Sequence, residues 1–421
     1  MRRVTDSAPS LPTSGWAVGA ALALVASGAA LRWSCLGADG LTQGEAAMAW
    51  CYSDVVGIFQ GRGLAADPSP YREVLTEYPP LTGLQWWAAG AASRTASGFF
   101  LLTAAAQTVA AAVTVVLLHR AGVGRGRLLL IALAPSLLLS GTLNWDLVAV
   151  ALLTAGLVVA GVRATPVGAS TAGGPAAAGA DVGGPAPVGP VRPLASGALL
   201  GLGGLAKVFP LAAVPVLAWW AVTAGHRRWA LHHGLAAVGT VAAIQVPVAL
   251  WAPSGWDAWI PLQRERPVDW DTVWYGIQRL TGHPLPAGVV EVLVLLAGAA
   301  GVAVILWHGR ARTEERWRLL LPVLIWILLA GKVHSPQFSL WLLPLLALSR
   351  VPLPLVGAWL LADAAVVLTR FPFLAAEHGF GMGSGVPTLP YPAFAAALVL
   401  RGVLLLLILA AVIRPRHPAR P

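Results

Sequence analysis

Residues 98–119 read GFFLLTAAAQTVAAAVTVVLLH, an apolar run that contains no Asp, Glu, Lys or Arg. A helix needs about 20 such residues to cross a bilayer. Comparable runs recur along the whole chain, which is 57% hydrophobic and 11% charged. Soluble domains carry about 25% charged residues. The sequence therefore predicts an all-α polytopic membrane protein.

Basic residues gather in the short loops between apolar runs, as in HRAGVGRGR at 119–127 and HGRARTEERWR at 308–318. Such loops stay in the cytoplasm. The formal net charge of +10 fits this rule, so we expect membrane lipids as partners and not nucleic acid. We predict about twelve spans with both termini in the cytoplasm, at residues 15–35, 98–119, 128–142, 146–162, 194–206, 209–224, 231–251, 286–308, 318–330, 337–348, 352–368 and 393–413.

The predicted spans form two membrane halves, at 15–162 and 194–413, flanked by cytoplasmic tails at 1–14 and 414–421. The linker between the halves, residues 163–193, is rich in Pro, Gly and Ala and has little to bury. We therefore expect this linker to be disordered in the cytoplasm.

A polar outer loop is predicted at 36–80, and its second part, 51–80, reads CYSDVVGIFQGRGLAADPSPYREVLTEYPP. This part carries six charged residues in a chain where charge is scarce. Residues 81–93 are too few to cross a bilayer and contain a pair of tryptophans typical of the membrane surface. We expect a surface helix there, and we interpret the loop before it as catalytic.

The chain has two cysteines, Cys35 and Cys51, and both fall on the predicted outer, oxidising side of the first span. A disulfide is one interpretation. Two unrelated small residues are the simpler interpretation, and it is favoured. The spacing is not that of a cysteine metal site.

The predicted topology brings polar residues that are distant in sequence to the outer side. Ionisable groups against a membrane are costly in free energy and are candidates for function. The residues concerned are Asp54, Glu77, Asn144, Asp146, Lys207, His334 and Gln337.

Asp54 lies between AWCYS and VVGIF, and a partly desolvated carboxylate can act as a general base. The alternative is that Ser53 and Asp54 cap a short helix. For Glu77, followed by Tyr78 and two prolines, the alternatives are an ion pair with an arginine and a contact to a sugar hydroxyl. The residues alone leave both pairs of alternatives open.

Asn144 and Asp146 lie at a predicted helix start, where Asp146 is a helix cap, a first-turn acid or a substrate ligand. Lys207 is a lone cation in GGLAKVFP that either snorkels to the interface or binds a phosphate. His334, close to Lys332, is a second candidate to bind a phosphate, although a single histidine is commonly structural.

Six motifs together resemble the actinobacterial glycosyltransferase 87 family. The resemblance covers most of the chain outside the linker and the tails, and it implies the GT-C membrane fold. The family includes polyprenyl-phosphate-mannose-dependent mannosyltransferases and related arabinofuranosyltransferases. The motifs, in order, are SDV (53–55), GRGL (61–64), EYPPLTG (77–83), LNWDLVAVAL (143–152), GLAKVFPL (204–211) and KVHSPQFSLWLLPL (332–345).

The resemblance implies that Asp54 is the acidic residue of the first outer loop that acts as base in an inverting transfer. It also implies that Lys207 and His334 face a lipid-linked donor, with Arg62 and Arg264 as further cations for its phosphate. Substrate contacts are expected from Glu77, Tyr78, Asn144, Asp146 and Gln337. The expected reaction moves a sugar, mannose favoured, to a lipid or glycan acceptor on the outer face of the cell membrane. We identify no HExxH, Walker, GxGxxG or D-x-D motif, so we expect neither a metal nor a cofactor besides the donor.

Two other classes of protein fit a polytopic chain with few buried charges. A transporter or lipid flippase predicts polar residues near the bilayer midplane and a path to both sides. An inactive scaffold protein of the cell envelope is the other alternative. The gathering of polar residues on one side counts against the transporter, and the presence of Asp54 with both cationic turns counts against the scaffold.

Overall fold

A computed structural model describes residues 11–36, 51–164, 191–310, 315–377 and 388–414. Most of the predicted linker, most of both predicted tails and residues 37–50 of the outer loop lie outside the described residues. The described secondary structure is helical apart from one isolated bridge, between Pro70 and Val74. The all-α prediction is confirmed for this part of the chain.

Among the described residues, six helices are long and apolar enough to cross a membrane, and each coincides with a predicted span. The protein is therefore a multi-pass membrane protein. The six are α1 (Leu11–Trp33), α5 (Ala96–Arg120), α11 (Arg227–Trp251), α15 (Ala287–Gly309), α18 (Leu353–Glu377) and α19 (Tyr391–Ile413).

The other six predicted spans are helical but short or broken, so the predicted count of about twelve full spans is too high. Prolines at 135, 210 and 336 begin new helical segments, because proline has no N–H to continue the preceding helix. The segments are α6 (Arg125–Ala132), α7 (Pro135–Ser140), α8 (Asp146–Val159), α9 (Val191–Ala206), η2 (Phe209–Ala212), α10 (Ala213–Thr223), η3 (Arg316–Leu319), α16 (Leu320–Ala330), η4 (Pro336–Phe338) and α17 (Ser339–Leu348).

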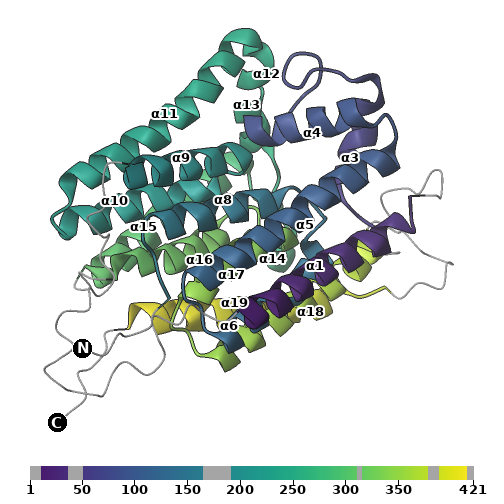
Figure 1. Ribbon diagram of the computed structural model, residues 1–421. Coiled ribbons are helices and arrows are strands. Elements are labelled where there is room, and N and C mark those ends of the chain that lie inside the picture. The colour runs from purple at the N-terminus through teal and green to yellow at the C-terminus, as the bar shows by residue number, and fades with distance from the viewer. Residues whose placement is uncertain (1–10, 37–50, 165–190, 311–314, 378–387, 415–421) are drawn as a thin grey trace, which may run out of the picture.

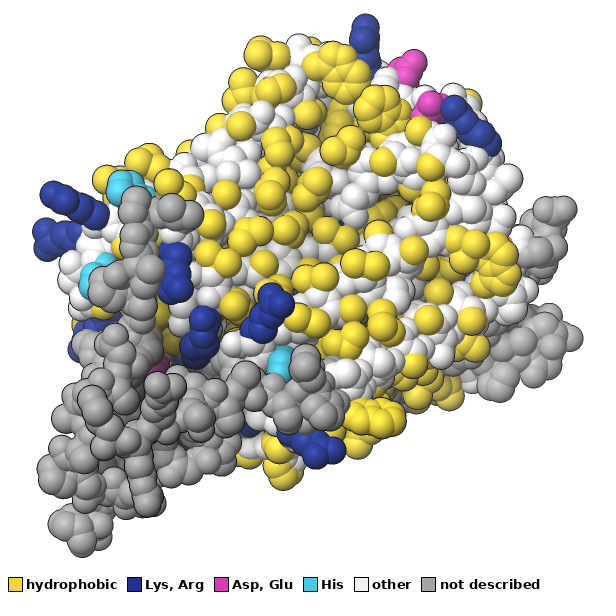
Figure 2. Space-filling view, viewed as in Figure 1, with side chains coloured by type: hydrophobic (Ala, Val, Ile, Leu, Met, Phe, Trp, Pro, Cys, Tyr) yellow, Lys and Arg dark blue, Asp and Glu magenta, His cyan; other side chains and the backbone are white. Residues whose placement is uncertain are grey.

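These helices run in broadly similar directions around one large apolar core, to which α1, α5, α8, α16 and α17 all contribute (Figure 1). By contrast, only 6% of the spanning window of α11 and 11% of that of α15 are buried, against 50% for α18. Figure 2 shows hydrophobic side chains across the middle of one face and charged side chains towards its ends. This distribution is the one expected of a surface that lies in lipid.

One end of the bundle carries short helices from segments that were predicted to lie outside: α3 (Asp54–Gly61), α4 (Pro80–Ala92), α12 (Pro253–Asp257) and α13 (Trp259–Glu265) (Figure 1, upper right). A further short helix, α14 (Val273–Thr281), belongs to the same predicted outer segment as α12 and α13. The 13 residues of α4 match the predicted surface helix.

Cys35 and Cys51 form a disulfide, with their Cα atoms 5.9 Å apart, so the favoured interpretation of two unrelated cysteines is wrong. The bond ties the chain just after α1 to the chain just before Asp54. Arg32, only 5% exposed, strengthens the same junction. Its guanidinium donates to the carbonyl oxygens of Tyr52 (3.1 Å) and Leu139 (2.6 Å) and to Oγ1 of Thr142 (3.2 Å). Three segments of the chain therefore meet at one buried cation.

Candidate active site

Asp54 opens α3, but its carboxylate does not cap that helix. Ser53 is the cap, since its hydroxyl oxygen accepts from the backbone N–H of Val55 at 3.3 Å. The same hydroxyl donates to the carbonyl oxygen of Thr142 at 2.9 Å, and the N–H of Asp54 donates to that of Leu143 at 3.0 Å. Ser53 thus fills the capping role, and the carboxylate of Asp54 is available for other contacts.

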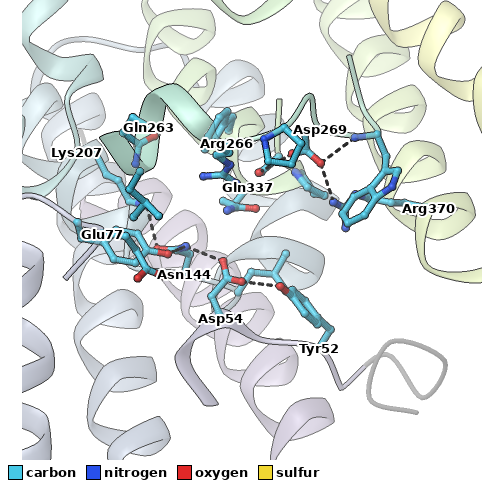
Figure 3. A pocket seen from close by; sticks show the side chains of 18 of the residues that line it. Tyr52, Asp54, Glu77, Asn144, Lys207, Gln263, Arg266, Asp269, Gln337 and Arg370 are labelled. Carbon is cyan, nitrogen blue, oxygen red and sulfur yellow. Dashed lines mark hydrogen bonds and ion pairs between the residues drawn. The ribbon is translucent and has the colours of Figure 1, made fainter. Parts of the chain in front are cut away.

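That carboxylate accepts one hydrogen bond at each oxygen. The hydroxyl of Tyr52 donates to Oδ1 at 2.8 Å, and Nδ2 of Asn144 donates to Oδ2 at 2.7 Å (Figure 3). A carboxylate has about four lone-pair positions, so room remains for a hydroxyl from a substrate. The negative charge of Asp54, together with burial, raises the pKa of Tyr52, so its hydroxyl stays a donor.

Asn144 joins the predicted base to the predicted cation. Its Nδ2 also donates to the hydroxyl oxygen of Tyr78 at 2.8 Å, and its Oδ1 accepts from Nζ of Lys207 at 3.0 Å. The ammonium of Lys207 lies 4.4 Å from the centre of the Tyr78 ring and 3.7 Å from a carboxylate oxygen of Asp146. Residues predicted from four separate segments therefore form one connected cluster.

Asp146 is fully buried in the first turn of α8 and makes no capping hydrogen bond there. Its Oδ1 accepts from the indole N–H of Trp341 at 2.7 Å. Asp146 therefore forms an ion pair with Lys207 from a fully buried position. It is not among the residues that line the pocket described next.

The cluster forms part of the wall of a pocket of about 500 Å³. Seven predicted site residues line this pocket: Asp54, Arg62, Glu77, Tyr78, Asn144, Lys207 and Gln337. Arg62 and Glu77 form an ion pair across its edge, as one of the alternatives for Glu77 expected.

Two predicted cations are not placed in the pocket. The side chain of Arg264 is 68% exposed and lies 3.8 Å from Glu291. His334 is buried, and burial together with the charge of Arg401 holds its pKa well below the ordinary 6.5. An imidazole in that setting is neutral near pH 7 and cannot supply the positive charge expected of it.

Several lining residues were not singled out from the sequence, above all Arg266 and the group of Asp269 and Arg370. Arg370 of α18 donates to Asp271 at 2.8 Å and to Asp269 at 3.4 Å. Burial raises the pKa of Asp271, and the guanidinium opposes this effect. The interpretation that the sequence has no D-x-D pair is wrong, since Asp269 and Asp271 form one, and this spacing was the available signal.

An apolar hollow of about 420 Å³ adjoins the polar pocket. Lys207 and Arg266 line both spaces, so two cations stand where they meet. The remainder of the hollow is mostly apolar, with Phe209, Leu324, Ile327, Leu328 and Trp341 among its walls. In the described parts of the chain, no group of three or more His, Cys, Asp or Glu side chains is arranged to hold a metal ion.

No protein-family model matches this sequence, and no curated protein matches it. Among solved structures, the fold is similar to the crystal structure of the Archaeoglobus fulgidus oligosaccharyltransferase in its apo form. The alignment has a TM-score of 0.40 and 12% sequence identity, and it covers 94% of this chain and 56% of that one. This chain thus spans a little over half the length of the archaeal protein.

Proposed function

We propose that this protein is an integral membrane glycosyltransferase. It moves a sugar, mannose favoured, from a polyprenyl-phosphate donor to a lipid or glycan acceptor on the outer face of the cytoplasmic membrane. One observation carries the proposal: a carboxylate with spare lone pairs, Asp54, shares a pocket with two cations at the mouth of an apolar hollow.

Each part of that arrangement suits one part of a lipid-linked donor. The apolar hollow fits the chain of the polyprenol, which would enter sideways from the bilayer. Lys207 and Arg266 fit the phosphate, because cations near a leaving phosphate stabilise its developing charge. Within the described residues Arg266 has no carboxylate partner within ion-pair distance, whereas Arg264 has one in Glu291. We therefore assign to Arg266 the phosphate contact that the sequence predicted for Arg264.

The proposed step is an inverting displacement. Asp54 takes the proton of an acceptor hydroxyl, whose oxygen forms the new bond to the anomeric carbon of the sugar. The bond from that carbon to the phosphate oxygen breaks, and the polyprenyl phosphate leaves with the electron pair. General-base assistance of this kind contributes about 10²- to 10⁴-fold to the rate. Asn144 orients the base, and Glu77, Tyr78 and Gln337 are the proposed contacts to the sugar.

The membership of the glycosyltransferase 87 family and the preference for mannose rest on the order of the six sequence motifs. The pocket supports a phosphate-linked sugar donor without distinguishing one sugar from another, since its polar lining would serve any pyranose or furanose. These finer assignments are part of the proposal.

A transporter or lipid flippase is the second candidate, and one observation favours it. Arg401 of α19 and Asp363 of α18 lie 3.6 Å apart, both almost fully buried within spanning helices. Ionisable pairs at such depth mark transport paths in many membrane proteins. Neither residue lines the two spaces described above, and for that reason the enzyme is preferred.

The deciding experiment is a donor screen. Membranes that contain the protein are given labelled polyprenyl-phosphate mannose or labelled polyprenyl-phosphate arabinose, and the lipid products are resolved. Membranes with the Asp54→Asn variant at equal expression are the control. We expect one donor to be consumed by the wild type alone. Consumption of neither donor, or equal consumption by the variant, would contradict the proposal.

A further inference from the structure

The catalytic pocket has two polar ends, with Asp54 between them. At one end Asn144 connects Asp54 to Lys207. At the other end Tyr52 bonds to Asp54 and packs against Phe371, with ring centres 5.7 Å apart, beside Arg370 and Asp269 (Figure 3). The proposed function uses only the first of these ends. The second end lies at the same pocket and has no assigned role.

The direction of an inverting transfer gives this second end a role. The attacking oxygen and the departing group lie on opposite faces of the sugar ring. If the phosphate lies at Lys207 and Arg266, the acceptor must reach Asp54 from the side away from them. That side is formed by Tyr52, Asp269 and Arg370.

The side chains at this end are held in place before any ligand arrives. Asp269 is 8% exposed and Arg370 is 7% exposed, yet both line the pocket. Oδ2 of Asp269 accepts from the hydroxyl of Ser335 at 3.1 Å, and its Oδ1 accepts from the backbone N–H of Trp270 at 2.9 Å. Carboxylates and guanidinium groups have further lone pairs and N–H groups, which suit the hydroxyls of a ligand.

The charge balance distinguishes neutral ligands from anionic ones. The guanidinium of Arg370 faces two carboxylates, those of Asp269 and Asp271, and Asp54 adds a third nearby. A second phosphate would meet an excess of negative charge at this end. Hydroxyl groups, which donate to carboxylates, would not.

We infer that the acceptor has a neutral, hydroxyl-rich head group, a sugar or another polyol, which binds between Tyr52, Asp269 and Arg370. This inference rests on the proposed function, because it takes the position of the phosphate from it. Asp269 and Arg370 then determine the choice of acceptor, whereas Lys207 and Arg266 hold the donor.

The test uses the full-length protein in lipid nanodiscs with octyl α-mannoside as a neutral probe and its 6-phosphate as an anionic probe. Equilibrium binding of both probes is measured on the wild type, Asp269→Asn and Arg370→Lys. Arg279→Lys is the matched control, because Arg279 pairs with Glu377 of the same helix as Arg370 and does not line the pocket. The KM for octyl α-mannoside and the KM for labelled polyprenyl-phosphate mannose are measured separately, with release of sugar to water as a readout that needs no acceptor.

We expect octyl α-mannoside to bind the wild type more tightly than its 6-phosphate does. Loss of the carboxylate in Asp269→Asn and of the planar guanidinium in Arg370→Lys should each weaken binding about tenfold or more, with no change in Arg279→Lys. The KM for the mannoside should rise while the KM for the donor stays constant. Equal binding of the two probes, or parallel changes in both KM values, would overturn the inference.

The two proposals fail in different ways. Sugar transfer by the wild type, with mannoside binding insensitive to both variants, removes the acceptor site and leaves the glycosyltransferase intact. The expected binding pattern without transfer or donor hydrolysis leaves the polyol site and removes the enzyme. The comparison of the two probes on the wild type also decides the case if a variant does not fold.

Discussion

The side-chain amide of Asn144 sets the relation between Asp54 and Lys207. Its Nδ2 lies 2.7 Å from Oδ2 of Asp54, and its Oδ1 lies 3.0 Å from Nζ of Lys207. One planar group thus separates the negative and positive centres and prevents their direct pairing. It also leaves the carboxylate free to accept a proton.

Asn144→Ala should lower kcat by about 10- to 100-fold, because one or two hydrogen bonds to charged groups are lost, each contributing about 1.5 kcal/mol or more. Without the amide, Lys207 can move onto Asp54 and neutralise it. The measurement is kcat with a saturating polyprenyl-phosphate donor, together with the midpoint of thermal unfolding. An unchanged kcat in a correctly folded variant would remove Asn144 from the site.

Asp54→Asn should reduce sugar transfer by at least about 10²-fold, the smaller estimate for general-base catalysis. Expression and donor binding should be retained, because the amide can keep one of the two hydrogen bonds. Asp67→Asn is the matched control, since Asp67 pairs with Arg94 outside the pocket. Transfer at the wild-type rate by Asp54→Asn would show that another group is the base.

Arg266→Ala should raise the KM for the donor, because one of two cations at the proposed phosphate position is lost. Arg264→Ala should have little effect, since its side chain is exposed and paired with Glu291. Two arginines that are two residues apart therefore give a matched pair. The measurement is the initial rate against donor concentration at fixed acceptor. Equal effects of the two variants would contradict the assignment of the phosphate to Arg266.

Stability should fall with rising pH above about pH 10, partly through Tyr52. The charge of Asp54 and burial raise the pKa of Tyr52 above its ordinary 10.0. Above pH 10 the unfolded chain releases this proton while the folded protein retains it, so a rise in pH favours unfolding. The contribution is complete below the unfolded pKa. Tyr52→Phe should show a shallower loss of thermal stability between about pH 9 and 11. Identical pH dependence would exclude a coupling of Tyr52 to the stability of the fold.

Loss of the disulfide should destabilise the end of the bundle that carries α3 and α4. The cysteines are 16 residues apart, and closing a loop of this length contributes about 3 kcal/mol to the free energy of unfolding. Thermal unfolding of Cys35→Ser with Cys51→Ser should report this loss, and kcat should fall because Cys51 is three residues from Asp54.

Maleimide labelling of the two cysteines should need prior reduction, and an impermeant reductant should act on intact cells. Labelling of the untreated protein would contradict the bond.

Hydropathy located the helices of this protein, and the predicted topology brought together polar residues that meet at one pocket. These predictions were possible because the length of an apolar run and the charge of a loop can be read directly from the sequence. The turns AKVFP and GKVHSPQ, each with a lysine, marked the breaks near Pro210 and Pro336 in the sequence. The break at Pro135 was not predicted, because this proline divides the otherwise almost wholly apolar run LLLIALAPSLLLS at 128–140. The apolar content there predicts burial and not continuity of the helix.

The sequence was sufficient to single out Asp54, Asn144 and Lys207 as residues of the pocket, but it did not single out Arg266. Asn144 is the sole asparagine of the chain and Lys207 one of only two lysines, so both were conspicuous. The sequence does not distinguish Arg264 from Arg266, because the local backbone decides which of the two side chains lines the pocket. The helix α13 ends at Glu265, and the chain turns at Arg266, with φ −55° and ψ 124°. The neutral state of His334 depends on burial and on Arg401, which is distant in sequence.

Arg32 has a consequence for the biogenesis of the protein. Its guanidinium binds carbonyl and hydroxyl oxygens of residues 52, 139 and 142, and Thr142 also accepts from the hydroxyl of Ser53, the residue before Asp54. Lys207 comes later still in the sequence. A nascent chain inserted only as far as α5 therefore carries Asp54 without Asn144, Lys207 or the residues that hold its segment in place. If the proposed function holds, a partly inserted chain cannot use donor lipid, because the pocket is complete only after α9 and Lys207 have been added.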